Sequence, residues 1–179
     1  MPIPGLHARL GGVRFRHEHQ VRRAVRAAFE RHRARIAAAL PAAEVEHIGA
    51  TAVPGTLTKG DLDLLVRVPR SEFAAAVANL ESLYEVNQPE NWNEGFASFR
   101  ELPKREVPVG VQLVVSGGID DRMLISWRDR LLNDPELLTR YNDFKRRHTD
   151  VAADAYIEAK AEFIESVLGG GIGGSGGPD

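Results

Sequence analysis

The chain has 179 residues, of which 43% are hydrophobic and 27% are charged, a composition typical of one folded domain. It contains no cysteine, which excludes disulfide scaffolds, thiolate metal sites and cysteine nucleophiles. No apolar run approaches the roughly 20 residues of a membrane span, and the first residues lack the apolar stretch of a signal peptide. We therefore expect a cytoplasmic protein without a membrane segment.

The net charge of −2 argues against nucleic acid as a partner of the whole chain. The charge is nevertheless unevenly distributed. Residues 1–40 contain nine arginines and two acids, which gives 9 − 2 = +7 and leaves −9 for the remainder. This basic segment could lie on phosphates, or it could be a helix whose solvated arginine face packs beside an acidic body, and the second arrangement is the more common.

The first elements alternate between helical and extended patterns. Apolar positions recur at three- and four-residue spacings over 17–40, which predicts a helix that Pro41 ends. Residues 45–48 are β-compatible and run into a loop of small residues and breakers at 49–55. Residues 61–68 predict a strand in the buried middle of a sheet, because its second half is almost entirely apolar.

The middle of the chain continues this mixed pattern. Ser71 is expected to cap the helix that follows it. Two extended segments come next, at 96–102 and 107–115. The second contains Pro108 and Gly110, so we expect its first part to be a sheet edge or a bulge.

The last third of the chain has helical periodicity. Apolar stripes continue from the glycines at 117–118 to residue 168, and residues 133–135 (Asn-Asp-Pro) end one helix and start the next. The glycine-rich residues 169–179 are expected to form a flexible tail. This order predicts an α+β fold with a small mixed β-sheet flanked by helices, in one domain of residues 1–168.

Two carboxylates, Asp61 and Asp63, stand two residues apart at the start of the predicted central strand. Alternate strand residues point to one face, so these side chains project side by side, roughly 7 Å apart at their Cα atoms. Carboxylates this close repel each other unless a cation joins them or one takes a proton. Mg²⁺ prefers such oxygen pairs and often contacts substrate phosphates as well. The pattern alone is also common where a strand begins beside a glycine-rich turn.

The loop before this strand adds a phosphate-binding pattern. Gly49 permits a close backbone approach, and the loop through Ala50 can offer N–H groups and the Thr51 hydroxyl to a phosphate oxygen. Lys59 adds a positive charge beside the carboxylates. Together these residues would hold a metal–polyphosphate group for an in-line displacement.

These motifs resemble a known family. Residues 46–55, EHIGATAVPG, are similar to the Glu-His-Ile-Gly-Ser-Thr-Ser/Ala-Val-Pro-Gly block of the GrpB family, and Lys59 and Asp63 fall where that family has Lys-Pro-x-x-Asp. Residues 127–131 and 156–164 also resemble family segments. Hydrophobic-Gly-Gly/Ser followed by Asp-hydrophobic-Asp is the signature of the nucleotidyltransferase superfamily, so the resemblance implies a nucleotidyltransferase-like (DNA polymerase β-like) fold.

The similarity runs from about residue 15 to 168, with two departures. Many GrpB members lack the first carboxylate, which this chain has as Asp61. Catalytic members of the superfamily usually carry a third carboxylate on a later strand, where this chain has Gln112. Glutamine can accept a hydrogen bond from a metal-bound water, but it brings no charge and cannot act as a base. We expect Asp61 and Asp63 to hold one Mg²⁺ ion rather than two.

Three further side chains are candidates for the site. Arg128 lies outside the apolar stripe of its helix and could clamp a phosphate bidentately or form an exposed ion pair. Lys160 shares a helix face with Tyr156, and the resemblance adds it to the phosphate-binding set. His47 could donate to a phosphate or orient Asp63, although a satisfied, partly buried histidine is the more common case.

The sequence is compatible with three functions. The first is Mg²⁺-dependent nucleotidyl transfer from a nucleoside triphosphate to an unknown acceptor, with Asp61 and Asp63 as the catalytic pair. The alternative is a non-catalytic module that binds a nucleotide or a phosphorylated metabolite. The third is an interaction domain whose basic first helix meets a partner. The first two require both acids to face a phosphate-sized hollow lined by the Gly49 turn.

Overall fold

The computed structural model describes residues 12–102 and 106–169. The predicted tail therefore lies outside the described residues, apart from Gly169 at the end of the last helix. The helices are α1 (Glu18–Ala39), α2 (Phe73–Glu81), α3 (Ile119–Asn133), α4 (Pro135–Arg147) and α5 (Ala153–Gly169), and the short 3₁₀ turns are η1 (Ala50–Ala52), η2 (Arg70–Glu72) and η3 (Pro89–Asn91). The strands are β1 (Arg16–His17), β2 (Glu44–Ile48), β3 (Leu57–Thr58), β4 (Leu62–Val68), β5 (Glu85–Val86), β6 (Phe96–Glu101) and β7 (Val109–Val115).

Five of these strands form one mixed sheet in the order β2-β4-β7-β6-β5. The central pair β4–β7 is parallel, and the other neighbours are antiparallel. Strands β1 and β3 form a separate antiparallel pair beside it. The predicted α+β fold with a small mixed sheet is confirmed.

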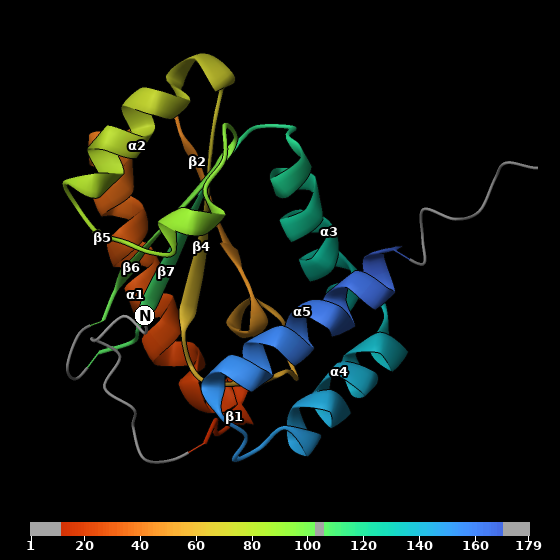
Figure 1. Cartoon of the computed structure of the whole chain (residues 1–179). Coiled ribbons are helices and arrows are strands. Elements are labelled where there is room, and N and C mark those ends of the chain that lie inside the picture. The colour runs from red at the N-terminus through yellow and green to blue at the C-terminus, as the bar shows by residue number, and fades with distance from the viewer. Residues whose placement is uncertain (1–11, 103–105, 170–179) are drawn as a thin grey trace, which may run out of the picture.

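Helices cover both faces of the sheet (Figure 1). Helices α1 and α2 pack on one face, and α3 packs on the other, with α4 and α5 gathered beyond it. The alternation along β4 explains this arrangement, because Leu62, Leu64 and Val66 belong to the core under α1 and α2 while Leu65 packs on the α3 side. A separate aromatic core joins the last three helices to the β2–β3 loop through the buried residues Val53, Trp127, Leu131, Tyr141, Phe144 and Tyr156.

Two local predictions are wrong. Strand β7 is central rather than a sheet edge or bulge, and Gly110 pairs in regular register with Asp63 on one side and Arg100 on the other. Pro108 lies just before the strand, where its carbonyl accepts a hydrogen bond from the backbone N–H of Leu62. Ser71 lies inside η2, and Glu72 rather than Ser71 occupies the cap position of α2.

Two predicted helix boundaries, the end of α1 and the start of α4, are confirmed. Helix α1 ends at Ala39, just before Pro41. Asp134 caps α4, because its Oδ1 accepts hydrogen bonds from the backbone N–H of Glu136 and of Leu137 at 3.1 and 2.9 Å. Within residues 12–102 and 106–169, no helix combines the length and the apolar character needed to cross a bilayer.

A network of charges ties α3 to the sheet. Glu46 of β2 pairs with Arg67 of β4 and with Arg128 of α3, the latter at 2.5 Å between Nη1 and Oε2. Arg128 also contacts Asp129 at 2.9 Å. The Nε of Arg67 and the Oδ1 of Asp121 are buried and lie 3.8 Å apart without a hydrogen bond. One carboxylate therefore balances two guanidinium groups from different layers.

We predict that Glu46→Gln lowers the free energy of unfolding by about 1–3 kcal/mol, because it leaves two partly buried cations without their shared counter-charge. Urea unfolding of both proteins measures the change. Glu30→Gln is the matched control, since the Glu30–Arg33 pair is more than half exposed on both sides, and it should change stability by less than about 0.5 kcal/mol. Equal losses in the two variants would contradict the role given to Glu46.

Candidate functional site

The predicted acidic strand sits under the turn that follows β2. Ile48, the last residue of β2, pairs with Asp63 of β4. The next residue, Gly49, has a φ of +75°, and a Cβ atom there would overlap the Asp63 carboxylate. On the other side, a Cβ on Gly110 would lie 3.0 Å from Oδ1 of Asp63. The carboxylate is therefore held between two stretches of backbone that lack side chains.

Burial dominates the electrostatics of Asp63 and raises the pKa of its carboxyl group. The charge of Lys160 on α5 lowers that pKa, and the charge of Asp61 raises it. Smaller effects come from Lys59 and from a hydrogen bond with Gln112, both of which lower the pKa. The structure thus brings both predicted carboxylates and two of the predicted cations within electrostatic reach of one another.

Asp61 lies just before β4 in a more open position. Its side chain is 35% exposed, and its Oδ2 lies 3.2 Å from Nζ of Lys59. Its backbone carbonyl accepts a hydrogen bond from the Thr51 hydroxyl at 2.9 Å. Thr51 in turn lies 2.9 Å from Nε2 of His47. Since the hydroxyl proton is already donated to Asp61, Nε2 of His47 must carry the proton of that second bond.

The remaining predicted residues lie in two different situations. Ala50 and Thr51 form part of η1, directly after Gly49, and Thr51 is only 5% exposed. Its hydroxyl is bonded within the loop, so a phosphate would have to displace an existing hydrogen bond to reach it. Arg128 lies on α3, where it is engaged by Glu46. Its phosphate-binding role stays a prediction.

Sequence reasoning missed two polar residues of α4 that pack against the loop. Asn142 accepts a hydrogen bond from the N–H of Leu57 at 2.8 Å and donates to the carbonyl of Gly55 at 2.9 Å. Lys145 is 1% exposed, donates from Nζ to the carbonyl of Leu57 at 2.5 Å, and lies 4.0 Å from the ring centroid of Tyr141. The sequence did contain one signal for the burial of Lys145, because this residue stands four positions after Tyr141 on the apolar stripe of the helix.

Lys145 also shares the electrostatic environment of the carboxylates. Burial, together with the charges of Lys160 and Lys59, lowers the pKa of Lys145 to about 6, while the charge of Asp63 raises it. Burial is also the main cause that raises the pKa of Tyr156 on α5, where Lys160 acts to lower it. The C-terminal helices therefore place lysines close to the acidic strand.

The acidic strand offers a cation at most two carboxylates, Asp61 and Asp63. Among residues 12–102 and 106–169, no group of three or more His, Asp or Glu side chains could hold a metal ion. Beside the two carboxylates, Oε1 of Gln112 is buried and has no hydrogen-bond partner in the described part of the chain. Such an oxygen can accept a hydrogen bond from a water on a cation held by two carboxylates, an arrangement that suits Mg²⁺.

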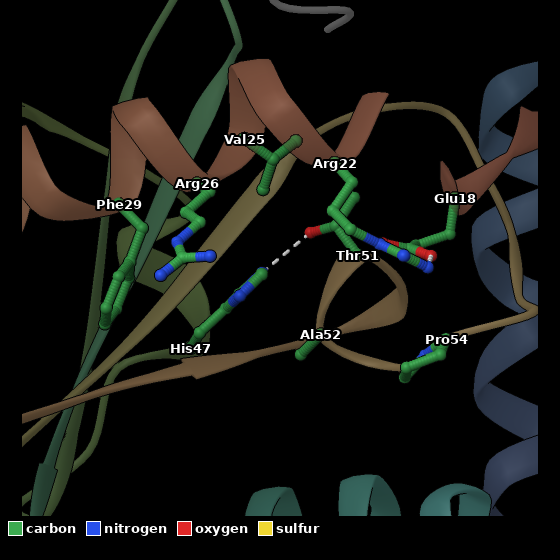
Figure 2. Close-up of a pocket in the computed structure, with 9 residues that line it drawn as sticks. All are labelled: Glu18, Arg22, Val25, Arg26, Phe29, His47, Thr51, Ala52 and Pro54. Atoms are coloured by element: carbon green, nitrogen blue, oxygen red, sulfur yellow. Dashed lines mark hydrogen bonds and ion pairs between the residues drawn. The ribbon is translucent and has the colours of Figure 1, made fainter. Parts of the chain in front are cut away.

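The loop also lines a cavity of about 220 Å³, but neither Asp61 nor Asp63 borders it. The cavity lies on the α1 side of the loop, between that helix and β2 (Figure 2). It is therefore a different feature from the phosphate-sized hollow that the sequence predicts beside the two carboxylates.

Comparisons with known proteins show which family and fold this chain resembles. A family model described as GrpB protein matches residues 19–169. A UPF0157 protein of Vibrio cholerae is 36% identical over 146 residues, which span 79% of this chain and 74% of that protein. A UPF0157 protein of Deinococcus radiodurans is 33% identical over 144 residues, with the same two shares.

Two solved structures place the fold. The crystal structure of conserved protein GrpB from Enterococcus faecalis superposes with a TM-score of 0.59 at 19% identity, covering 81% of this chain and 95% of that one. The Cid1 poly(U) polymerase with MgGTP bound superposes with a TM-score of 0.51 at 15% identity, covering 73% of this chain and 42% of that one. The predicted nucleotidyltransferase-like fold is confirmed.

We predict that Gly49→Ala destabilises the protein far more than Gly117→Ala. Both glycines have similar positive φ values, +75° and +71°, but a Cβ on Gly117 meets nothing within 4 Å. The Gly117 variant should lose about 1–2 kcal/mol for its backbone conformation alone, whereas the Gly49 variant must also displace Asp63 and should lose at least about 3 kcal/mol. Urea unfolding measures both, and equal losses would contradict the close approach to Asp63.

We also predict that Asp63→Asn stabilises the ligand-free protein. Because burial raises the pKa of Asp63, the native state binds more protons than the unfolded state between the unfolded pKa of about 3.9 and the higher native pKa. Stability is lost as the pH rises through that interval, so the carboxylate costs stability at neutral pH. The variant should raise Tm at pH 7 by roughly 2–4 °C. The difference should shrink as the pH falls toward about 4. Asp61→Asn, at the half-open neighbouring position, should not show this gain, and a lowered Tm in Asp63→Asn would contradict the argument.

Proposed function

The chain belongs to the GrpB family, and on that premise we propose that it binds a Mg²⁺–nucleoside triphosphate and transfers the nucleotidyl group to an acceptor hydroxyl. The observation that carries the proposal is the Asp63 carboxylate, which is pressed between Gly49 and Gly110 and is subject to the charge of Lys160. A carboxylate held at such a cost to stability is typical of a functional site. The likeness of the fold to a polymerase solved with MgGTP supports the ligand class.

In this proposal, charged side chains from both halves of the chain bind the ligand. Asp61 and Asp63 would hold the ion, and the unpartnered Oε1 of Gln112 would accept a hydrogen bond from one of its waters. The ion would supply positive charge to the phosphates and fix their orientation. Lys59 and Lys160 would pair with phosphate oxygens that lie outside the carboxylates.

The loop at η1 would receive the remaining phosphate oxygens. Gly49 places the backbone close to Asp63, and the N–H groups that follow can face an anion. The hydroxyl of Thr51 would have to leave the carbonyl of Asp61 to join them. Arg128 would likewise have to leave Glu46. These two residues are therefore the most costly members of the proposed phosphate set.

In the proposed transfer, an acceptor oxygen forms a bond to the α-phosphorus. The bond from that phosphorus to the α–β bridging oxygen breaks, and pyrophosphate leaves with the electron pair. The hydroxyl proton passes to solvent, because Gln112 cannot accept it as a third carboxylate would. The same absence of a base favours the second candidate, a module that binds a nucleotide or a phosphorylated metabolite without turnover.

Nucleotide binding is tested by thermal unfolding with ATP, CTP, GTP and UTP, each with and without Mg²⁺. We expect one of them to raise Tm by roughly 5–10 °C at saturation, and only with the metal present. Asp63→Asn should abolish the shift. Asp143→Asn, which removes an exposed carboxylate paired with Arg146 on α4, should retain it. A shift that survives in Asp63→Asn, or no shift with any nucleotide, would contradict the site.

Turnover separates the two candidate functions. Pyrophosphate release, measured with a cell extract as the source of acceptors and lost in Asp61→Asn, identifies a transferase. Nucleotide binding without release identifies a binding module. If Gln112→Asp raises the release, the missing third carboxylate limits the natural chain.

A further inference from the structure

The cavity on the α1 side of the loop is a feature that the proposed nucleotide site does not use. Its volume is about 220 Å³, which exceeds the roughly 150 Å³ of an apolar protein cavity that holds benzene. It is therefore large enough for a six-membered ring with a substituent. The lining residues are Glu18, Arg22, Val25, Arg26, Phe29, His47, Thr51, Ala52 and Pro54.

The walls of this cavity are largely apolar although charged residues surround it. Val25 and Phe29 project from α1, and Ala52 and Pro54 come from the loop (Figure 2). The rings of Phe29 and His47 are stacked, with centroids 5.6 Å apart and an interplanar angle of 26°. The cavity is therefore lined by two aromatic rings together with aliphatic side chains, a combination that suits a small ligand with an apolar ring.

His47 contributes a neutral ring to this wall. Burial lowers its pKa to about 4, with Arg128 acting in the same direction and Glu18 against it. Its Nε2–H is donated to Thr51, so Nδ1 carries a lone pair rather than a proton. A neutral imidazole can stack on an aromatic ligand without adding charge to the cavity.

Glu18 and Arg22, two charged residues that line the cavity, form an ion pair with each other. Glu18 is only 2% exposed, and its two oxygens accept hydrogen bonds from Nε and Nη2 of Arg22 at 2.7 and 2.5 Å. Both oxygens of Glu18 are thereby engaged, whereas Arg22 keeps further N–H donors on a side chain that is 56% exposed. The pair adds no net charge to this end of the cavity.

Arg26 is different, because it forms no ion pair with any residue in the described part of the chain. It stands one helical turn after Arg22, and Figure 2 shows its guanidinium reaching from α1 toward His47, beside Phe29. A cation in this position, at the mouth of an apolar, ring-lined cavity, favours a ligand with a negative charge at one end.

We propose that this cavity binds a small aromatic carboxylate, with its ring against Phe29 and His47 and its carboxylate on Arg26. The site is separate from the proposed nucleotide site, because neither Asp61 nor Asp63 lines it. The two sites share the η1 loop, since Thr51 lines the cavity and also bonds to the carbonyl of Asp61. A bound ligand would therefore contact the segment that precedes the acidic strand.

The test uses benzoate as the probe, with benzamide as the uncharged analogue of the same shape and acetate as the charge without the ring. Titrations of the ¹⁵N-labelled full chain are followed by amide chemical shifts in the absence of nucleotide. We expect benzoate to cause saturable shifts at Val25, Phe29 and Thr51, with benzamide at least about tenfold weaker and acetate without effect at these residues.

The matched variants are Arg26→Gln and Arg23→Gln. Both remove one exposed arginine from α1, but only Arg26 lines the cavity. Arg26→Gln should weaken benzoate binding about tenfold or more, and Arg23→Gln should leave it unchanged. Absent or unsaturable benzoate shifts, equal losses in the two variants, or benzamide binding as tight as benzoate would each overturn the proposal. Asp63→Asn should not alter benzoate binding, so failure here is distinguishable from failure of the nucleotide site.

Discussion

The close approach of the Gly49 backbone to the Asp63 carboxylate is the constraint on which the rest of the site depends. Antiparallel register places the end of β2 directly beside Asp63, so the turn that follows has to pass over this side chain. Only a residue without a Cβ fits there, and on the other neighbouring strand a Cβ on Gly110 would make a tight contact with the same carboxylate, at 3.0 Å. The resulting burial raises the pKa of Asp63, and the charges of Lys160 and Lys59 offset part of that rise.

One of those cations, Lys160 of α5, comes from the other end of the sequence, and the other, Lys59, lies beside Asp61. Helix α4 adds Lys145, whose pKa of about 6 leaves the amine largely uncharged at pH 7. Helix α4 is held in place by bonds to the loop backbone, in which Asn142 contacts Gly55 and Leu57. The first half of the chain therefore supplies both acids and Lys59, and the second half adds Lys160 once the helices pack against the sheet.

The sequence was sufficient for features that depend on local periodicity, and insufficient for those that depend on contacts between distant elements. The alternation of core faces along β4 follows from the period of a β-strand, and the α+β order follows from the hydrophobic pattern. Pro108 and Gly110 indicated a sheet edge or a bulge, because local rules cannot show that Gly110 lies beside the Asp63 carboxylate in the middle of the sheet. Lys145 was missed for a similar reason, since its partner is a backbone carbonyl 88 residues earlier.

The η1 loop separates the acidic strand from the cavity beside α1. One side meets the acidic strand and the lysines, and the other meets the ring-lined cavity under α1. Two consecutive hydrogen bonds cross this loop, from His47 to the Thr51 hydroxyl and from that hydroxyl to the carbonyl of Asp61. A ligand that displaces Thr51 from either side must break the same bonds. If a ligand in one site changes the affinity of the other site through the position of Thr51, the second ligand changes the affinity of the first by the same factor, because coupling between two binding sites is reciprocal.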